Sequence, residues 1–249
     1  MLAELLELAP AGFEQVDGDG VVEFALYGAP GELPELATGP AELAGIRVEV
    51  SGTELADDWA DRWREFHQPA QIGQLHVRPP WSEPAGDGVD IAIDPAQAFG
   101  TGAHPTTRLS LELLLDVLPA PLVDLGCGSG VLAIAAAKLG FSPVTALDHD
   151  PAAIEATRDN ARANGVTLER VERHDLRVAP APTAPVMTAN LMRPLLLRVA
   201  ELLPEQPETL IVSGLLEAEE EELAAAFAPL RERRRLRLQG WSALLLTRP

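Results

Sequence analysis

The chain has 249 residues, of which 47% are hydrophobic, so it can bury a sizeable core in one or two domains. Its 38 acidic and 19 basic side chains leave a formal net charge of −19, which disfavours nucleic acid as a direct partner and favours a basic one. A single cysteine excludes an internal disulfide, and no apolar run is long enough to span a membrane. The first residues carry no basic side chain, so we expect no signal peptide and a cytoplasmic location without membrane contact.

The first fifty residues predict a small α+β domain over residues 1–52. A helical pattern at the start is followed by two strands joined at "DGDG", and "AGIRVEVSG" predicts another strand. A connecting helix is expected over residues 53–69, because its aromatic residues share one helical face. That face either packs on a neighbouring element or belongs to a helix that carries the small domain. Residues 70–249 then form the main domain, with a loop between 78 and 90.

From about residue 119 the main domain alternates short β-rich segments with helical ones. Strands separated by helices predict a parallel sheet, and the last two strands have no room for a helix between them, so they add an antiparallel hairpin. The fold class is therefore α/β, Rossmann-like, with seven strands and a terminal hairpin. The seven segments are 121–126, 143–148, 168–175, 185–191, 208–215, 233–239 and 242–248.

A glycine-rich turn, "DLGCGSG", joins the first of these strands to a helix. Gly126, Gly128 and Gly130 allow a ligand to approach the backbone closely. Their spacing differs from the dinucleotide fingerprint G-x-G-x-x-G, because position 131 is Val. Cys127 has no basic neighbour in sequence, so we do not expect a nucleophile.

Acidic residues follow the strands around this turn. Asp148 ends the second strand, where a carboxylate accepts hydrogen bonds from ribose hydroxyls or caps the next helix. Asp175, after the third strand, either faces an adenine amino group or caps its turn. Asp124, just before the glycines, is expected to hold the loop or the ammonium group of a ligand. Together they form the pattern of seven-strand S-adenosylmethionine methyltransferases.

A second loop, "DPAQAFGTGAHPTT" at residues 94–107, lies sixteen residues before the glycine-rich turn. Together with "DDWADRWREFHQP", "DLGCGSGVLAIAAAKLG", "ALDHDPAAIEATRDNARANGV" and "TANLMRPLL", it resembles the ribosomal protein L11 methyltransferase (PrmA) family over roughly residues 57–197. The Phe-Gly-Thr-Gly-x-His-Pro-Thr-Thr loop is the most specific part of the resemblance. Position 103 is Ala where a polar residue is commoner, and "NLM" replaces the more frequent Asn-Ile-Leu.

The resemblance implies one S-adenosylmethionine held between the two loops, with no metal. It makes Thr107, Gly126, Asp148 and Asn190 cofactor contacts, and Asn190 also orients the amine that receives the methyl group. It places a substrate gate over the methyl group, and this gate comprises Phe99, Gly100, Thr101 and Gly102. His104 belongs to the same loop, either as a general base or as a structural residue.

The implied reaction is methyl transfer to lysine ε-amines or the α-amine of ribosomal protein L11, a basic substrate that the small N-terminal domain recognises. The N-terminal domain departs from the family pattern, because the chain begins within the first helix and lacks the expected leading strand. A methyltransferase of another protein or a small molecule, and a non-catalytic nucleotide-binding adaptor, remain alternatives. The only basic run, residues 231–237, is interpreted as a solvated sheet edge, and the acidic run at 217–222 as the exposed start of a helix.

Overall fold

The computed structural model describes residues 14–17, 22–25, 38–43, 45–52, 68–84, 86–94, 102 and 104–249. Contacts divide the chain into two compact units, Met1–Arg64 and Glu65–Pro249, each of which is described by itself. Most of the expected connecting helix over 53–69, and the helix expected at the start of the chain, lie outside the described residues.

The first unit contains two antiparallel strand pairs. Strand β1 (Glu14–Asp17) pairs with β2 (Val22–Ala25), as the sequence predicted for the segments around "DGDG". Strand β4 (Ile46–Val50) was also predicted, and it pairs with β3 (Gly39–Leu43). The sequence did not predict β3, because glycine and proline at its start are both unfavourable in strands.

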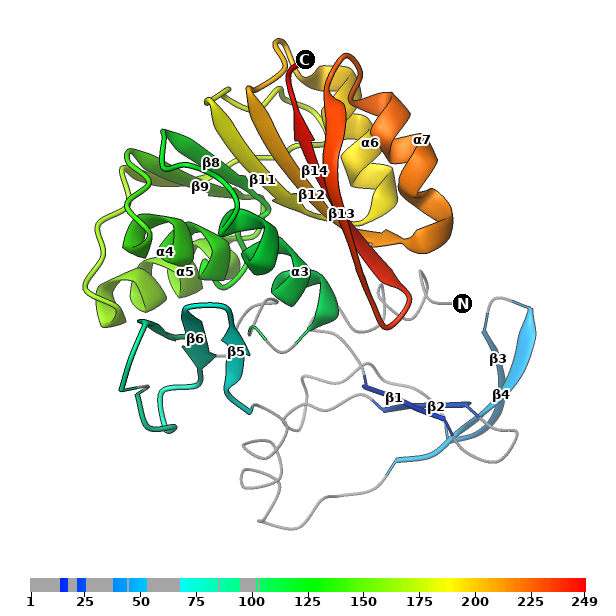
Figure 1. The fold of residues 1–249 in the computed structure, drawn as a ribbon. Helices are drawn as coiled ribbons and strands as arrows, with labels where there is room; N and C mark the ends of the chain where they lie inside the picture. The colour runs from blue at the N-terminus through cyan, green and yellow to red at the C-terminus, as the bar shows by residue number, and fades with distance from the viewer. Residues whose placement is uncertain are drawn as a thin grey trace. The chain divides into compact units, whose positions relative to one another are not determined.

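The second unit contains two sheets. Figure 1 shows them on either side of the helices over residues 105–114, 131–138 and 151–163. The smaller sheet has three strands in the order β5 (Ala70–Ile72), β6 (Leu75–Arg78) and β7 (Val89–Ala92). The sequence did not predict these strands, which have only three or four residues each, so their periodicity is too short to recognise.

The larger sheet has seven strands in the order β10-β9-β8-β11-β12-β14-β13. Every pair up to β12 is parallel, and β14 pairs antiparallel with both β12 and β13, so the predicted sheet and its terminal hairpin are confirmed. Its strands are β8 (Leu122–Leu125), β9 (Val144–Asp148), β10 (Arg170–Arg173), β11 (Val186–Asn190), β12 (Thr209–Leu216), β13 (Arg231–Leu238) and β14 (Trp241–Thr247).

Helices cover both faces of this sheet (Figure 1). Alternate strand residues point to opposite faces, so neighbours such as Leu122 and Val123 enter two different hydrophobic clusters. The first cluster includes side chains of α3 (Pro105–Leu114), α4 (Val131–Lys138) and α5 (Pro151–Ala163). The second includes side chains of α6 (Arg193–Leu202) and α7 (Glu220–Ala226), which follows the short 3-10 helix η1 (Glu217–Glu219).

The parallel strands β8, β9, β10, β11 and β12 end at the same edge of the sheet. Ligands of open α/β sheets bind outside the carboxyl ends of the strands, so the segments that follow these strands form the candidate site.

Candidate active site

The glycine turn, residues 126–130, leaves the end of β8 and is attached to the next strand. The backbone N–H groups of Gly126 and Cys127 both donate to the carbonyl of Leu147, at 2.8 and 3.0 Å. Gly126 has a φ of 70°, and a Cβ there would lie 2.2 Å from the Cδ2 of Leu191. The positive φ therefore favours glycine at this position, and a larger residue would also require the side chain of Leu191 to shift.

Asp148 holds the glycine turn from the end of β9. Its Oδ2 accepts from the backbone N–H of Gly128 at 3.0 Å, and its Oδ1 accepts from that of Asp150 at 3.0 Å. Asp150 is the N-cap of α5, accepting from Ala152 at 2.9 Å, so the alternative of Asp148 as the cap is excluded. Oδ1 also lies 3.2 Å from the Nδ1 of His149, whereas Oδ2 has a second lone pair and so keeps acceptor capacity for a ligand hydroxyl.

Asp124 lies beneath the glycine turn and is 1% exposed. The hydroxyl of Thr188, on the neighbouring strand β11, donates to its Oδ1 at 2.6 Å, and its Oδ2 has no hydrogen-bond partner among the described residues. Burial raises the pKa of Asp124 to about 7; hydrogen bonds from Thr188 and from the backbone of Ala133 oppose the rise, and the nearby charge of Asp148 adds to it. Within the described part of the chain, Oδ2 is thus a buried carboxylate atom without a well-formed hydrogen bond, although the backbone of Ala133, in α4, also interacts with this carboxyl group.

Asn190 ends β11 and contacts the first turn of α3. Its Nδ2 donates to the Oγ1 of the buried Thr107 at 3.4 Å. Ser213, on β12, donates to the carbonyl of Thr106 at 3.0 Å, so two strand ends hold the start of this helix. The structure thus brings Thr107 and Asn190 together, although 83 residues separate them in sequence.

His104 is the N-cap of α3. Its Nδ1 accepts from the backbone N–H of Thr106 at 3.3 Å and lies 2.8 Å from the Oγ1 of the same residue. Its ring meets the edge of Trp241 at a centroid distance of 5.3 Å. Burial lowers the pKa of His104 and thus favours the neutral ring. This geometry favours the structural interpretation of His104 over the general base.

The remaining gate residues are only partly described. Phe99, Gly100 and Thr101 lie outside the described residues. Gly102 is buried with a φ of 85°, and a Cβ there would lie 2.5 Å from Val77, on β6. The C-terminal end of the second loop is therefore packed against the three-stranded sheet.

Asp175 interacts with Arg177 two residues later. The guanidinium donates to both carboxylate oxygens, at 2.8 and 2.9 Å, and the Arg177 backbone N–H donates at 3.0 Å. These hydrogen bonds lower the pKa of Asp175 to about 2. The arrangement favours the capping interpretation of Asp175 over a contact with an adenine amino group.

Cys127 is buried within the turn, and the hydroxyl of Thr157 lies 3.2 Å from its sulfur. Burial, with the charge of Asp124, raises the pKa of the thiol above its ordinary value. The thiol is thus protonated at neutral pH, as expected for a residue that is not a nucleophile.

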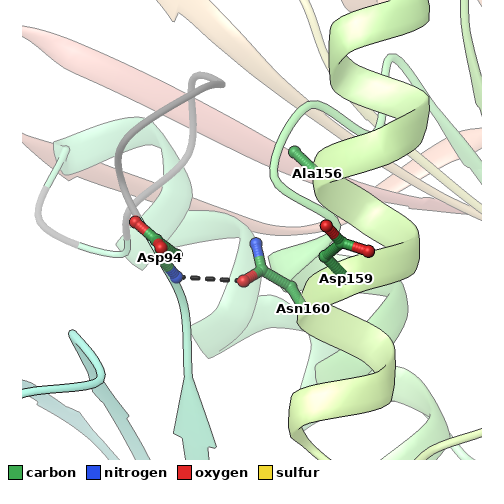
Figure 2. A pocket seen from close by; sticks show the side chains of 4 residues that line it. All are labelled: Asp94, Ala156, Asp159 and Asn160. Atoms are coloured by element: carbon green, nitrogen blue, oxygen red, sulfur yellow. Dashed lines mark hydrogen bonds between the residues drawn. The ribbon is translucent and has the colours of Figure 1, made fainter.

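Sequence reasoning missed the polar face of α5, which comprises Thr157, Asn160 and Asn164. The Thr157 hydroxyl donates to the carbonyl of Gly128 at 2.9 Å, and the Asn160 amide donates to that of Ser129 at 2.9 Å. Asn160 also lines a hollow of about 80 Å³ with Asp94, Ala156 and Asp159 (Figure 2). The signal was present in the sequence, since these polar residues recur three and four positions apart on one helical face.

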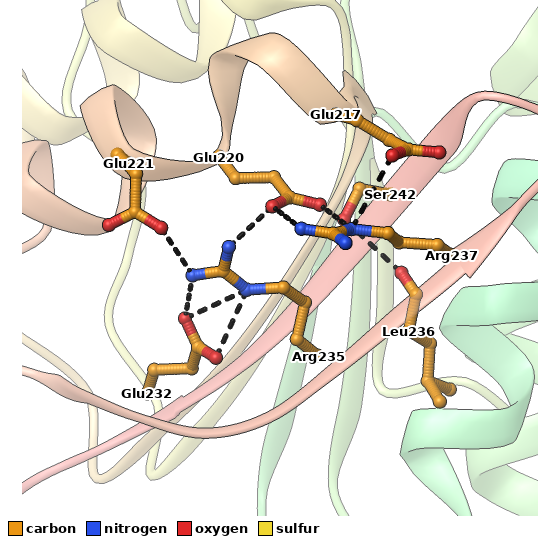
Figure 3. Close-up of polar contacts among 8 residues, drawn as sticks. All are labelled: Glu217, Glu220, Glu221, Glu232, Arg235, Leu236, Arg237 and Ser242. Atoms are coloured by element: carbon orange, nitrogen blue, oxygen red, sulfur yellow. Dashed lines mark hydrogen bonds and ion pairs between the residues drawn. The ribbon is translucent and has the colours of Figure 1, made fainter.

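The acidic and basic runs form one ion-pair cluster (Figure 3). The carboxylate of Glu220 is 2% exposed and accepts from Arg237 at 2.7 and 2.6 Å and also from Arg235. The hydrogen bonds from Arg237, with smaller contributions from Ser242 and Arg235, lower the pKa of Glu220 to about 2. The expectation of a wholly exposed acidic run was therefore wrong at Glu220, because this side chain turns inward to the arginines.

The basic run does form the sheet edge, as β13, but three of its arginines are paired. Arg235 and Arg237 bind the acids of the segment after β12, and Arg234 bridges Glu112 and Asp116 at 2.9 and 2.5 Å. Pairing neutralises much of the charge that a phosphate backbone would need.

A family model described as Ribosomal protein L11 methyltransferase (PrmA) matches residues 32–249. The chain belongs to this family. It is 41% identical over 203 residues to the Ribosomal protein L11 methyltransferase of Edwardsiella ictaluri, covering 78% of this chain and 69% of that protein. It is 40% identical over 215 residues to that of Serratia proteamaculans, covering 81% of this chain and 72% of that protein.

Among solved structures, a ribosomal protein L11 methylase from Lactobacillus delbrueckii subsp. bulgaricus superposes with a TM-score of 0.66 at 27% identity. The match covers 73% of this chain and 99% of that one. For the two curated relatives above, the matched region is about two thirds to three quarters of their length. In the described part of the chain, no helix is both long enough and apolar enough to cross a membrane.

Proposed function

We propose that this chain transfers methyl groups from S-adenosylmethionine to amino groups of ribosomal protein L11, at lysine ε-amines or the α-amine. The observation that carries the proposal is a continuous line of contacts at the carboxyl edge of the sheet. Thr107 contacts Asn190, the next residue Leu191 packs on Gly126, and the same turn is held by Asp148. Four of these five residues, all except Leu191, are the ones that the family resemblance makes cofactor contacts.

The groups on this edge fit the cofactor. The unpartnered Oδ2 of Asp124 suits an ammonium donor, and the remaining lone pairs of Asp148 suit ribose hydroxyls. The glycine turn, with a positive φ at each of its three glycines, allows close approach of a ligand to the backbone. When bound, S-adenosylmethionine supplies an electrophilic methyl group on a sulfonium centre.

The protein's part in the reaction is alignment. Methyl transfer is accelerated mainly when the amine nitrogen is held in line with the methyl group, because two reactants that are already bound and oriented need not meet by chance. The side-chain oxygen of Asn190 accepts from an amine N–H, and its Nδ2 is held by Thr107, which fixes the direction of the amide. The amine is neutral when it reacts: a lysine pKa of about 10.4 falls on entry into a desolvated site. The proton leaves to solvent before transfer.

The substrate assignment rests on charge as well as on the family. A net charge of −19 steers a basic protein toward the chain, and the paired arginines of β13 offer little to nucleic acid. Two exposed apolar side chains lie at this edge: Met192, two residues after the end of β11, and Leu216, the last residue of β12. Both suit contact with the aliphatic stem of a lysine. We assign recognition of the rest of the substrate to the small N-terminal domain, residues 1–52.

The test incubates the full chain with labelled S-adenosylmethionine and ribosomal protein L11, followed by intact-mass and site analysis. We expect mass gains in steps of one methyl group at amines. Asn190→Ala should lower transfer by about 100-fold, the scale of a misaligned reactant. Gln71→Ala, which removes an exposed amide on β5, is the matched control and should leave the rate unchanged.

Each negative result has a separate meaning. Binding of S-adenosylhomocysteine without transfer to this substrate would remove ribosomal protein L11 and favour another protein or a small molecule. Absence of binding would refute the cofactor assignment and favour a non-catalytic adaptor. An unchanged rate in Asn190→Ala would refute the role of the amide.

A further inference from the structure

Asn160 on α5 joins the two loop segments of the candidate site. Its Nδ2 donates to the carbonyl of Ser129, in the glycine turn, at 2.9 Å. Its Oδ1 accepts from the backbone N–H of Asp94 at 3.0 Å (Figure 2). Asp94 is the first residue of the second loop. Asn160 is 4% exposed; its hydrogen bond with Ser129 is buried, and the one with Asp94 is partly buried.

The neighbouring Asn164 makes a similar but separate connection. Its Oδ1 accepts from the backbone N–H of Ala92 at 2.9 Å, and its Nδ2 donates to the Ala92 carbonyl at 2.6 Å. Strand β7 is an edge strand whose other side pairs with β6, so the two asparagines supply hydrogen bonds that a further strand would otherwise make. Asn164 therefore secures β7 through Ala92, whereas the side chain of Asn160 bonds both the glycine turn and Asp94.

We propose that Asn160 is a positioning residue that fixes the glycine turn relative to Asp94 and thereby sets the geometry in which the cofactor binds. This inference rests on the proposed function. The other polar residue of this face, Thr157, holds only the turn, through the Gly128 carbonyl. Loss of the Asn160 amide would thus remove its link between the glycine turn and Asp94. The turn would still be held by Thr157, and β7 by Asn164.

The test compares Asn160→Asp with the matched variant Asn164→Asp in the full chain. In Asn160→Asp the acceptor for the Asp94 N–H is kept, but a carboxylate oxygen faces the carbonyl of Ser129 and repels it. We expect the Kd of S-adenosylhomocysteine to rise about 10-fold or more at pH 8.5, measured by calorimetry. Asn164→Asp should lower the melting temperature and leave this Kd within about twofold of wild type.

A pH series separates positioning from simple loss of stability. As the pH falls to 5.5, the new carboxyl of Asn160→Asp becomes neutral, regains an O–H donor for Ser129, and recovers affinity relative to Asn164→Asp. Other titratable groups near position 160 are present in both variants, so their effects cancel in the ratio of the two Kd values. These groups are Asp94 and Asp159, which line the hollow, and the buried Asp124. If Asn160→Asp does not fold at pH 8.5, Asn160→Ser removes both hydrogen bonds without a charge, and the same loss is expected at every pH.

Wild-type affinity in Asn160→Asp and Asn160→Ser, or an equal loss in Asn164→Asp, would overturn the inference while leaving the proposed function intact. Failure of the wild-type chain to bind S-adenosylhomocysteine would instead overturn the proposed function, and with it the role of Asn160 in ligand binding.

Discussion

Replacing Asp124 with Asn should make the stability of the protein much less dependent on pH. Asp124 is fully buried, and its pKa rises from 3.8 to about 7 in the folded state. A group with a raised pKa in the folded state stabilises the fold most below the unfolded pKa, and this contribution is lost as the pH rises toward the folded value. The interval between 3.8 and about 7 corresponds to about 4 kcal/mol.

Asn keeps the oxygen that accepts from Thr188 and carries no charge. The stability of Asp124→Asn minus that of wild type should therefore increase by up to about 4 kcal/mol between about pH 4 and pH 8. Equilibrium unfolding in urea at a series of pH values measures this difference. The overall charge of −19 is nearly the same in both proteins, so its effect largely cancels.

Asp159→Asn is the matched control for loss of one negative charge. Its carboxylate is 71% exposed, on the outer side of α5, and a change there should give a difference that is flat with pH. The reasoning from burial would be refuted if the free energy of unfolding of Asp124→Asn changed with pH in parallel with that of wild type. Ionisation of Asp124 would then cost the folded protein no stability.

Three further outcomes are expected. Glu220→Gln should lower stability by about 2 kcal/mol near pH 7. Since the folded pKa of Glu220 is depressed from 4.5 to about 2, that difference should disappear as the pH falls from 4.5 toward 2 in acid unfolding; a constant difference would contradict the ion-pair explanation. Gly126→Ala places a Cβ 2.2 Å from Leu191 and should weaken binding of S-adenosylhomocysteine more than about 10-fold by calorimetry, whereas wild-type affinity would show that the turn adapts. His104→Ala removes the cap of α3 and the contact with Trp241, so stability should fall by about 1 kcal/mol while the transfer rate at saturating substrate changes less than about 10-fold; a loss of 100-fold or more would restore the general base.

The main sheet and the outline of the candidate site could be predicted from sequence because their signals are local. Strand β9 is an unbroken buried run of five residues between a proline and the N-cap of α5, which a single window of sequence reveals. Gly126 directly follows β8 and Asp148 ends β9, so their place at the carboxyl edge comes from the order of the elements alone.

Other features depend on hydrogen bonds and ion pairs that no sequence pattern specifies, whether the partner is near or distant in sequence. Whether Asp175 faces a ligand or Arg177, and whether His104 caps a helix or takes a proton, follow from hydrogen bonds that have no signature in composition. Glu220 belongs to an acidic run, and only the approach of β13 identifies it as the member that is buried.

The sequence by itself determined the order of the strands along the chain, the glycine turn and the family, because backbone propensity, apolar periodicity and contiguous motifs are properties of neighbouring residues. Only the tertiary structure decided that Asn160 joins Ser129 to Asp94, since the amide must meet two backbone groups 31 and 66 residues away. It alone also decided that Asp124 is buried and bonded to Thr188, because burial and hydrogen-bond supply depend on how β8 and β11 lie against each other.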